Sequence, residues 1–388
     1  MTSLQKAENR HEGYAARLLR KTFSRWSARI GAAWIALLAV VAVFAPFLAN
    51  SRPLWVSVGG HGYSPLLQGL TWADIGWLAA FFGALLLWSL PLRFGQRLLG
   101  LLAIILIASL IGKAALKPRT IEIYEQYREQ ATQYDEVIYT LVPYSPRDYQ
   151  RDRGDTGFQP PSREHWFGTE ENGADTLSRM IHASRVALSI GFVATGIALV
   201  IGVFIGGLMG YFSGLFDIIG MRVVEIFEAI PTLFLLLTFV AFFGRNLYIM
   251  MVIIGLTSWT GYTRYLRAEF LKLRDQDYVQ AARAAGLPLG SILFRHMLPN
   301  GVAPVLVGAS FGVASAILAE ATLSFLGLGL VDVPSWGQML FQAVRFSSFN
   351  WWMAVFPGGA IFFTVFAYNL IGDALRDAID PHLSTVEE

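Results

Sequence analysis

Residues 277–300 read DYVQAARAAGLPLGSILFRHMLPN and separate two long apolar segments. Asp277, with Gln280 three residues later, has the spacing of a capping box, in which Asp277 accepts a backbone N–H and Gln280 reaches back. Gly286 is predicted at the position just after a helix, with positive φ, where a side chain would cost ~1–2 kcal/mol. Because Pro288 prevents continuation of this helix and can begin another, the stretch predicts two short helices divided by a turn.

The second piece places its larger side chains on one helical face, and Pro299 then opens the next apolar segment. The residues on this face are Leu289, Ile292, Leu293, His296 and Met297. In the first piece Ala281, Ala282, Ala284 and Ala285 make a thin helix that a partner's backbone can approach closely. A groove in a protein and a lipid surface are both open as partners, and the alanine face argues against lipid because methyl groups bury little apolar area.

The composition indicates an integral membrane protein. The chain has 388 residues, of which 54% are hydrophobic and 15% charged, against roughly 25% charged residues in an average soluble domain. The net charge of +2 is too small to suggest nucleic acid. The absence of cysteine excludes a disulfide framework, a thiolate metal site and a cysteine nucleophile. The expected fold class is an all-α polytopic bundle.

Eight segments are apolar enough for a helix to cross the ~30 Å hydrocarbon core. They are 30–49, 75–91, 98–116, 186–211, 218–243, 247–263, 302–325 and 352–374. The expected organisation is a basic N-terminal tail 1–29, a first span 30–49, an outer loop 50–74, an extra apolar helix pair 75–116, a second outer loop 117–185, a core 186–374 with a polar loop 264–301, and a C-terminal tail 375–388.

Lysine and arginine in short flanks predict the orientation. The first 29 residues, the link with Arg93 and Arg97, and the 264–301 loop are all basic, and eight spans place them on one side, which is then the cytoplasm. Both termini are therefore expected in the cytoplasm. The long outer loop 117–185 is either a solvated connector or a docking surface for an outside partner.

Several blocks of the sequence resemble one family. QAARAAG followed nine residues later by HMLP resembles the EAA loop of ABC-importer permeases, with Gln280 where many members have Glu. HWFGTEENGADTLSRMIHASRVALSIG, MRVVEIFEAIP, GLTSWTGYTRYLRAEFL, EATLSFLGLGL, PSWGQML and NLIGDALRDAIDPHL extend the likeness over about 165–383. The chain thus resembles the second permease of the dipeptide/oligopeptide/nickel family, with features of the microcin-C/oligopeptide sub-branch. Glu225 replaces a usual Asp, and the pair 75–116 departs from the family's six-span core.

The resemblance implies a peptide-importer subunit that forms half of a pathway with a second permease. Separate ATPase subunits would grip the cytoplasmic loop, and an outer solute-binding protein would deliver the cargo. The residues implied in contact with the ATPase are Asp277, Tyr278, Gln280, Ala281, Ala282, Gly286, His296, Leu298 and Pro299. Microcin-like peptides, opines and nickel chelates stay open as cargo. A stand-alone secondary transporter or channel would need inverted repeats or charges at midplane, of which the sequence shows few.

Four residues are candidates for the pathway or its gate. Glu225 and Glu228 near the cytoplasmic start of a span fit this role, although an ion pair of Glu225 with Arg222 at i,i+3 is favoured. Pro231 predicts a kink and a hinge. Glu320, near the outer face, either caps the pathway or contacts the delivering protein, or it anchors the SFLGLG turn.

A row of glycines is open to two interpretations, and two short motifs are rejected. Gly202, Gly206 and Gly210 indicate close helix packing, or else the permease–permease seam or a moving gate. GASFG at 308–312 lies inside a span, where no nucleophile elbow forms, and IGKAA at 111–115 lacks Walker A spacing. The six histidines show no metal-binding spacing. We therefore expect no catalytic residue, cofactor or metal, and ATP hydrolysis on another subunit.

Overall fold

The computed structural model describes residues 14–92, 94–116, 126–149, 157–330, 333–345 and 350–379. The chain divides into two compact units, each discontinuous in sequence. Unit 1 comprises Met1–Ala36, Ala187–Val331 and Gly359–Glu388, and unit 2 comprises Leu37–Val186 and Asp332–Gly358. Most of the expected C-terminal tail, the first 13 residues of the N-terminal tail, Arg93 and parts of the 117–185 loop lie outside the described residues.

Six helices of the described chain are long and apolar enough to cross a membrane, in a predominantly helical fold. They are α3 (Trp26–Val43), α6 (Trp72–Ser89), α7 (Phe94–Ala115), α9 (Thr176–Phe212), α17 (Ala303–Leu323) and α19 (Trp351–Ile379). A bent pair, α10 (Gly214–Ala229) and α11 (Thr232–Phe243), makes a seventh when its two helices are counted as one broken span. Seven of the eight expected spans thus have a counterpart.

The expected span 247–263 is divided between two helices, α12 (Leu247–Thr257) and α13 (Trp259–Leu273), which meet at Ser258. Helix α12 has 11 residues, too few for a ~30 Å core at 1.5 Å each. Helix α13 has 15 residues and carries Arg264, Arg267, Glu269 and Lys272, so it is too short and too charged to cross a membrane by itself. The expectation of eight spans counted α12 and the start of α13 as one helix because the pattern of apolar residues does not reveal the break.

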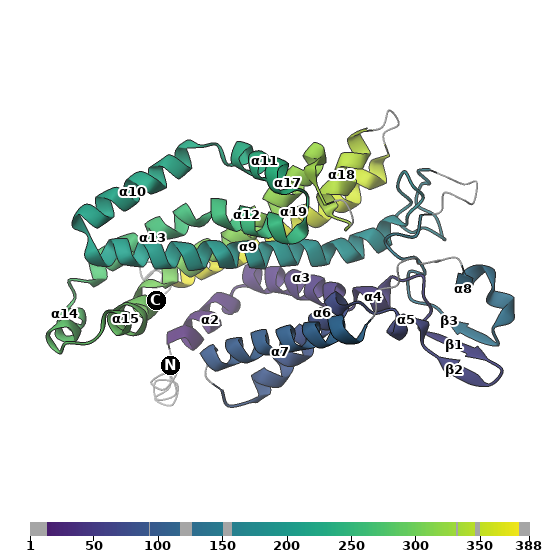
Figure 1. Ribbon diagram of the computed structural model, residues 1–388, viewed down its shortest axis with the longest axis horizontal. Helices are drawn as coiled ribbons and strands as arrows, with labels where there is room; N and C mark the ends of the chain where they lie inside the picture. Colours follow the sequence, from purple (N-terminus) through teal and green to yellow (C-terminus); the bar gives the residue numbers. More distant parts are fainter. Residues whose placement is uncertain are drawn as a thin grey trace. The chain divides into compact units, whose positions relative to one another are not determined.

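The kink predicted at Pro231 is present, because α10 and α11 are inclined at 81° across it. Proline has no N–H and its ring excludes the residue before it from helical geometry. Ile230 is accordingly extended, with φ −87° and ψ 122°. Figure 1 shows the resulting bend between α10 and α11.

In unit 1 the glycine row of α9 packs against α13. A Cβ on Gly206 would lie 2.4 Å from the carbonyl oxygen of Thr263, and a Cβ on Gly202 would lie 2.5 Å from Cβ of Tyr262. Such distances are too short for real atoms, so only glycine permits this approach. The interpretation as close packing within the chain is confirmed, and the alternative of a permease–permease seam is wrong for this face because α13 occupies it.

The two ends of the chain meet in unit 1. Helix α2 (Tyr14–Ser24) precedes α3, so the described part of the expected N-terminal tail is helical. Arg25 forms an ion pair with Asp377 near the end of α19, which continues past the expected boundary at 374 to Ile379. The indole Nε1 of Trp34 also donates to Thr364 Oγ1 at 3.1 Å. The segments around Arg25 and Asp377 therefore lie side by side.

Unit 2 contains a small sheet that the all-α expectation did not include. Its strands are β1 (Trp55–Val58), β2 (His61–Tyr63) and β3 (Glu136–Ile138), in the order β2-β1-β3 with antiparallel pairing. Strands β1 and β2 are joined through Gly59 and Gly60, whose φ values of 55° and 81° suit a two-residue hairpin. The sheet joins the segments 50–74 and 117–185, which the sequence presented as two separate loops.

Short helices complete both units. In unit 2 they are α4 (Ala45–Leu48), α5 (Pro65–Gln68), α8 (Gln126–Glu129), η1 (Ala131–Gln133) and α18 (Trp336–Arg345). In unit 1 they are α14 (Asp277–Ala284), α15 (Leu289–Ser291), the π-helical turn η3 (Ile292–Met297), α16 (Leu298–Gly301) and the π-helical turn η4 (Ser324–Leu328).

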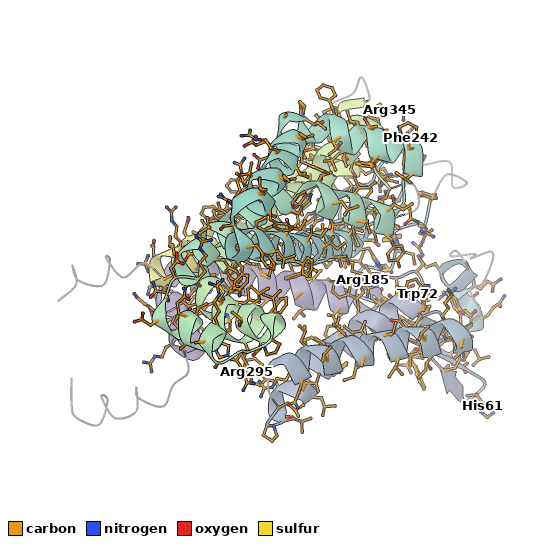
Figure 2. The ribbon with its side chains drawn as sticks, turned by 60° about the vertical axis from the view of Figure 1, so that its left-hand side comes forward. His61, Trp72, Arg185, Phe242, Arg295 and Arg345 are labelled. Atoms are coloured by element: carbon orange, nitrogen blue, oxygen red, sulfur yellow. The ribbon has the colours of Figure 1, made fainter. Side chains whose placement is uncertain are left out.

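The extra helix pair α6–α7 is tied to the start of α9 within unit 2. Arg185 of α9 forms an ion pair with Asp74 of α6 and also donates to the carbonyl oxygens of Ala42 (2.5 Å) and Val43 (3.1 Å). Asp74 and Thr71 form the capping box at the start of α6. Figure 2 shows Arg185 beside the start of α6, where Trp72 is labelled. The guanidinium of Arg185 therefore binds both the carbonyl oxygens at the end of α3 and the carboxylate at the start of α6.

Candidate coupling surface

Helix α14 begins one residue earlier than the sequence indicated. Its N-cap is Gln276, whose backbone is extended, and Asp277 is the first helical residue. The predicted capping box between Asp277 and Gln280 is therefore wrong. The amide of Gln280 instead donates to the carbonyl oxygen of Arg274 at 3.0 Å, and Asp277 keeps only the favourable placement of an acidic group in the first turn.

The turn at the end of α14 has the predicted geometry. Gly286 has φ +68°. Its N–H donates to the carbonyl oxygen of Arg283 at 2.9 Å, and the N–H of Leu287 donates to that of Ala282 at 3.2 Å. This pair of bonds is a Schellman motif, which ends a helix at a glycine. Pro288 follows as the N-cap of α15.

Helix α14 buries one face against its own chain and exposes the other. Val279 and Ala282 are buried, in a cluster with Leu266 and Phe270 of α13. The exposed residues of α14 and its turn include Tyr278, Gln280, Ala281, Ala284, Ala285 and Gly286. Ala282 therefore packs inside the chain, and the surface that a partner can approach is formed by the other three alanines and Gly286.

The second piece of the loop is partly π-helical. Ile292, Leu293 and Met297 are buried in the same cluster, as the amphipathic pattern predicted. Leu289 is exposed and His296 is half-buried, so the predicted face is only partly covered. Because Pro299 has no N–H to donate to Arg295, the regular hydrogen-bonding pattern cannot continue at this point. Leu298 is half-buried, and Pro299 is exposed.

A contact that the sequence did not reveal joins α14 to α9. The guanidinium of Arg283 lies 4.6 Å from the ring centroid of Tyr211, and its Nε donates to the Tyr211 hydroxyl at 3.1 Å. Tyr211 is the penultimate residue of α9. Figure 1 shows α14 next to this end of α9, where α10 begins. An arginine within an alanine-rich helix gives no sequence signal for such a distant partner.

Two ion pairs connect α13, which leads into α14, with α10. Arg267 binds Asp217 through two hydrogen bonds, one of them 2.6 Å from Nη2 to Oδ2. Arg264 pairs with Glu228. The predicted pair of Arg222 with Glu225 is confirmed, at 2.5 Å from Nη1 to Oε2. The bidentate pair is the more specific link because both guanidinium nitrogens are oriented by one carboxylate.

Glu320 is buried in α17 and belongs to the turn that follows it. Its side chain is 2% exposed, and its Oε1 accepts a 2.6 Å hydrogen bond from the hydroxyl of Ser324, the first residue of η4. Gly327 within η4 has φ +82°. Of the sequence interpretations, anchoring of the SFLGLG turn fits this environment, whereas contact with a delivering protein does not.

The block before α9 in unit 2 is held by two buried contacts between ionisable side chains. Nδ1 of His165 lies 2.8 Å from Oδ2 of Asp175, and the other oxygen of Asp175 accepts the N–H of Ser178 at 2.7 Å. Glu170 lies 3.0 Å from Nε of Arg179. Burial raises the pKa of Glu170, and Arg179 opposes this rise. These residues fix the start of α9.

In the described ranges no three side chains among His, Asp and Glu come together as metal ligands. Asp175 and His165 are satisfied by each other and by the N–H of Ser178. The exposed face of α14 offers small side chains and backbone.

The chain is similar in sequence to a known family and to several of its members. The sequence model of the family described as "Binding-protein-dependent transport system inner membrane component" matches residues 202–385. The dipeptide transport system permease protein DppC of Alkalihalophilus pseudofirmus is 38% identical over 228 residues, covering 58% of this chain and 75% of the relative. The oligopeptide transport system permease protein OppC of Bacillus subtilis is 35% identical over 241 residues, covering 62% of this chain and 79% of the relative.

One solved structure is also similar. A chain of the MetNI methionine ABC transporter, in inward-facing conformations, is 18% identical with a TM-score of 0.44, covering 52% of this chain and 97% of that chain.

Proposed function

The chain belongs to the family of binding-protein-dependent transport system inner membrane components, and from that premise we propose that it is one permease subunit of an ATP-driven peptide importer. Two relatives are described as permeases of dipeptide and oligopeptide transport systems. The family and the apolar helices make it a multi-pass membrane protein. It would contribute half of a translocation pathway, with a second permease as its partner.

The observation that carries the proposal is the exposed small-residue surface of α14. Ala281, Ala284, Ala285 and Gly286 are exposed, and the Schellman motif and the Arg283–Tyr211 contact hold them in place. A helix with such a narrow face fits a groove of another protein. The natural occupant is a separate ATPase subunit, which would grip α14 and move α13 with it.

The orientation of the proposed subunit follows from its basic segments. The 264–301 loop carries six lysines and arginines, which favours the cytoplasm. Both termini would be cytoplasmic, and the ion pair between Arg25 and Asp377 supports their common side. The segments 50–74 and 117–185 of unit 2 would then face outward, toward a solute-binding protein that delivers the cargo.

The chain itself would be non-catalytic, without cofactor, and ATP would be hydrolysed on the separate ATPase. Peptide is the proposed cargo, and microcin-like peptides, opines or nickel chelates are narrower alternatives that a binding screen with the solute-binding protein distinguishes. Glu225 and Glu228 would border the pathway, and the bend at Pro231 would serve as the hinge of a gate. A stand-alone transporter or channel would instead work without the ATPase.

The test introduces a charge on the free face of α14. Ala281→Asp places a carboxylate where the ATPase would pack, while Ser24→Asp places one on an exposed residue of α2 as the matched control. Because a buried unpaired charge costs about 3–5 kcal/mol, co-purification of the ATPase and cargo-stimulated ATP hydrolysis should fall at least ~10-fold in the first variant only. Unchanged values for Ala281→Asp would refute the docking role.

A further inference from the structure

Helices α9 and α10 meet at a strained joint of two residues. Ser213 has φ 50° and ψ −157°, and Gly214 has φ 59°. Within the part of the chain that the structure describes, Ser213 is the sole residue other than glycine with a positive φ. Its φ and ψ lie beside a region that is essentially limited to glycine, so the serine raises the free energy of this conformation. The hydroxyl does not offset this cost by capping α10, since it makes no capping hydrogen bond.

The chain before the joint is tightly packed. A Cβ on Gly210 of α9 would lie 2.7 Å from the carbonyl oxygen of Arg267, so the backbones of α9 and α13 are in contact next to the joint. Tyr211 connects α14 to the same end of α9 through its cation–π contact and hydrogen bond with Arg283. The buried sides of α13, α14 and η3 share one apolar cluster, against which Tyr211 also packs. The end of α9, α13, α14 and η3 therefore form a single packed block.

Helix α10 is attached to the packed block by fewer contacts. Among its 16 residues, Asp217 and Val224 are buried. Arg267 of α13 binds Asp217, and Arg264 of α13 binds Glu228. Ion pairs between partly exposed side chains contribute much less to stability than a packed apolar interface does. A rotation of α10 away from the packed block would therefore break few stabilising contacts.

We propose that α10 rotates against the packed block about Ser213 and Gly214, and that Arg283 is a positioning residue that makes α14 move together with α9. This inference rests on the proposed importer function and deepens it. An ATPase that binds and displaces α14 would displace the whole block, and the strain at Ser213 would favour the rotation. Without the contact between Arg283 and Tyr211, the displacement would reach the joint less directly, through α13.

The length of α10 makes the rotation measurable. With 16 residues the helix is ~24 Å long. A rotation of ~15°, the size of a known rigid-body transition, would move its far end by ~6 Å.

Distances between pairs of spin labels test the rotation in the complete importer. The natural chain has no cysteine, so labels can be attached at chosen exposed positions. Val200→Cys with Ile226→Cys spans α9 and the far end of α10, and Val200→Cys with Gly290→Cys spans the packed block from α9 to α15, which leads into η3. A non-hydrolysable ATP analogue should shift the first distance by ~6 Å and leave the second unchanged. A constant first distance, or an equal change in both, would overturn the rotation.

Variants of the contact between α9 and α14 test the role of Arg283. In Arg283→Gln the analogue should also change the distance between residues 200 and 290, because α14 is no longer held to the end of α9. Tyr211→Phe keeps an aromatic ring beneath the guanidinium and should retain the wild-type response, whereas Tyr211→Leu should respond as Arg283→Gln does. A wild-type response in both Arg283→Gln and Tyr211→Leu would show that Arg283 does not position α14.

The strain at Ser213 has a test of its own. Ser213→Gly removes the conformational cost, while Ser213→Ala keeps it and serves as the matched control. Relief of the strain should favour the conformation described here by at least ~5-fold. If two analogues bind, the analogue concentration that half-shifts the distance between residues 200 and 226 should rise at least ~2-fold in Ser213→Gly only. Equal concentrations in the two variants and the wild type would remove Ser213 from the joint.

The proposed function is read out separately on the same labelled preparations. A chain that neither co-purifies with the ATPase nor supports cargo-stimulated hydrolysis would refute that function, and the inference with it. An active complex in which α10 does not move relative to α9 would refute the inference alone.

Discussion

Substitution of Gly286 by alanine should weaken the turn after α14 through backbone strain alone. Gly286 has φ +68°, and an added Cβ would meet no atom within 4 Å. Steric contact therefore contributes nothing, and the cost is that of a left-handed conformation with a side chain, ~1–2 kcal/mol. This corresponds to roughly a 5–30-fold shift of the local opening equilibrium.

Hydrogen exchange measures this shift directly. The amides of residues 286 and 287 donate to Arg283 and Ala282 in the Schellman motif, so both should exchange roughly 5–30-fold faster in Gly286→Ala. Gly290→Ala is the matched control, because Gly290 also has open space but no positive φ. Gly286→Asn should lie between the wild type and Gly286→Ala, since asparagine tolerates this conformation better than alanine. Exchange at the wild-type rate in Gly286→Ala would refute the reasoning.

Three further predictions concern the rest of the chain. Gly206→Ala should lower the free energy of unfolding by about 1–3 kcal/mol, because its Cβ would lie 2.4 Å from Thr263 O, whereas Gly196→Ala on the same helix meets nothing and should be neutral or stabilising in thermal unfolding. Asp74→Asn should leave Arg185 with an uncompensated charge and cost about 3 kcal/mol, seen as faster proteolysis of the α6–α7 pair before the remaining chain unfolds; equal rates would contradict the anchor. Because burial raises the pKa of Glu170, the folded state holds that proton more tightly than the unfolded state, so the side chain's contribution to stability falls as pH rises through the raised pKa. The melting temperature of the wild type minus that of Glu170→Gln should therefore decrease between pH 4 and pH 7, and a constant difference would contradict the burial of this carboxyl group.

Local signals in the sequence predicted several features of unit 1. Gly286 and Pro288 predicted the turn, and Pro231 predicted the bend between α10 and α11. The pair of Arg222 with Glu225 followed from helical spacing. Each of these features depends on residues within four positions of one another, so periodicity and backbone preference determine them.

The features that were missed depend on distant partners or on a boundary shifted by one residue. The contacts of Arg283 with Tyr211 and of Arg185 with Asp74 join residues 72 and 111 positions apart. The glycine row of α9 had a correct spacing, but the sequence could not tell whether α13 or another subunit covered it. The prediction of a capping box was wrong because the N-cap, with its extended backbone, is Gln276 rather than Asp277.

The sheet in unit 2 was missed because its strands are very short. Strand β1 has four residues and strands β2 and β3 have three each. Such short runs carry no alternation that would distinguish them from loop. Only the pairing of β1 with β3, across about 80 residues, gives them a regular structure.

Cross-linking from α14 to the ATPase tests the central claim most directly. The natural chain has no cysteine, so Ala284→Cys on the exposed face of α14 provides a single thiol. In the assembled importer a short thiol-to-amine cross-linker attached to this cysteine should join the permease to a lysine of the ATPase subunit, with a yield that changes when ATP is added. The account would be contradicted if this thiol were labelled only by reagents added outside intact cells. It would also be contradicted if the thiol gave no cross-link to the ATPase in an active complex.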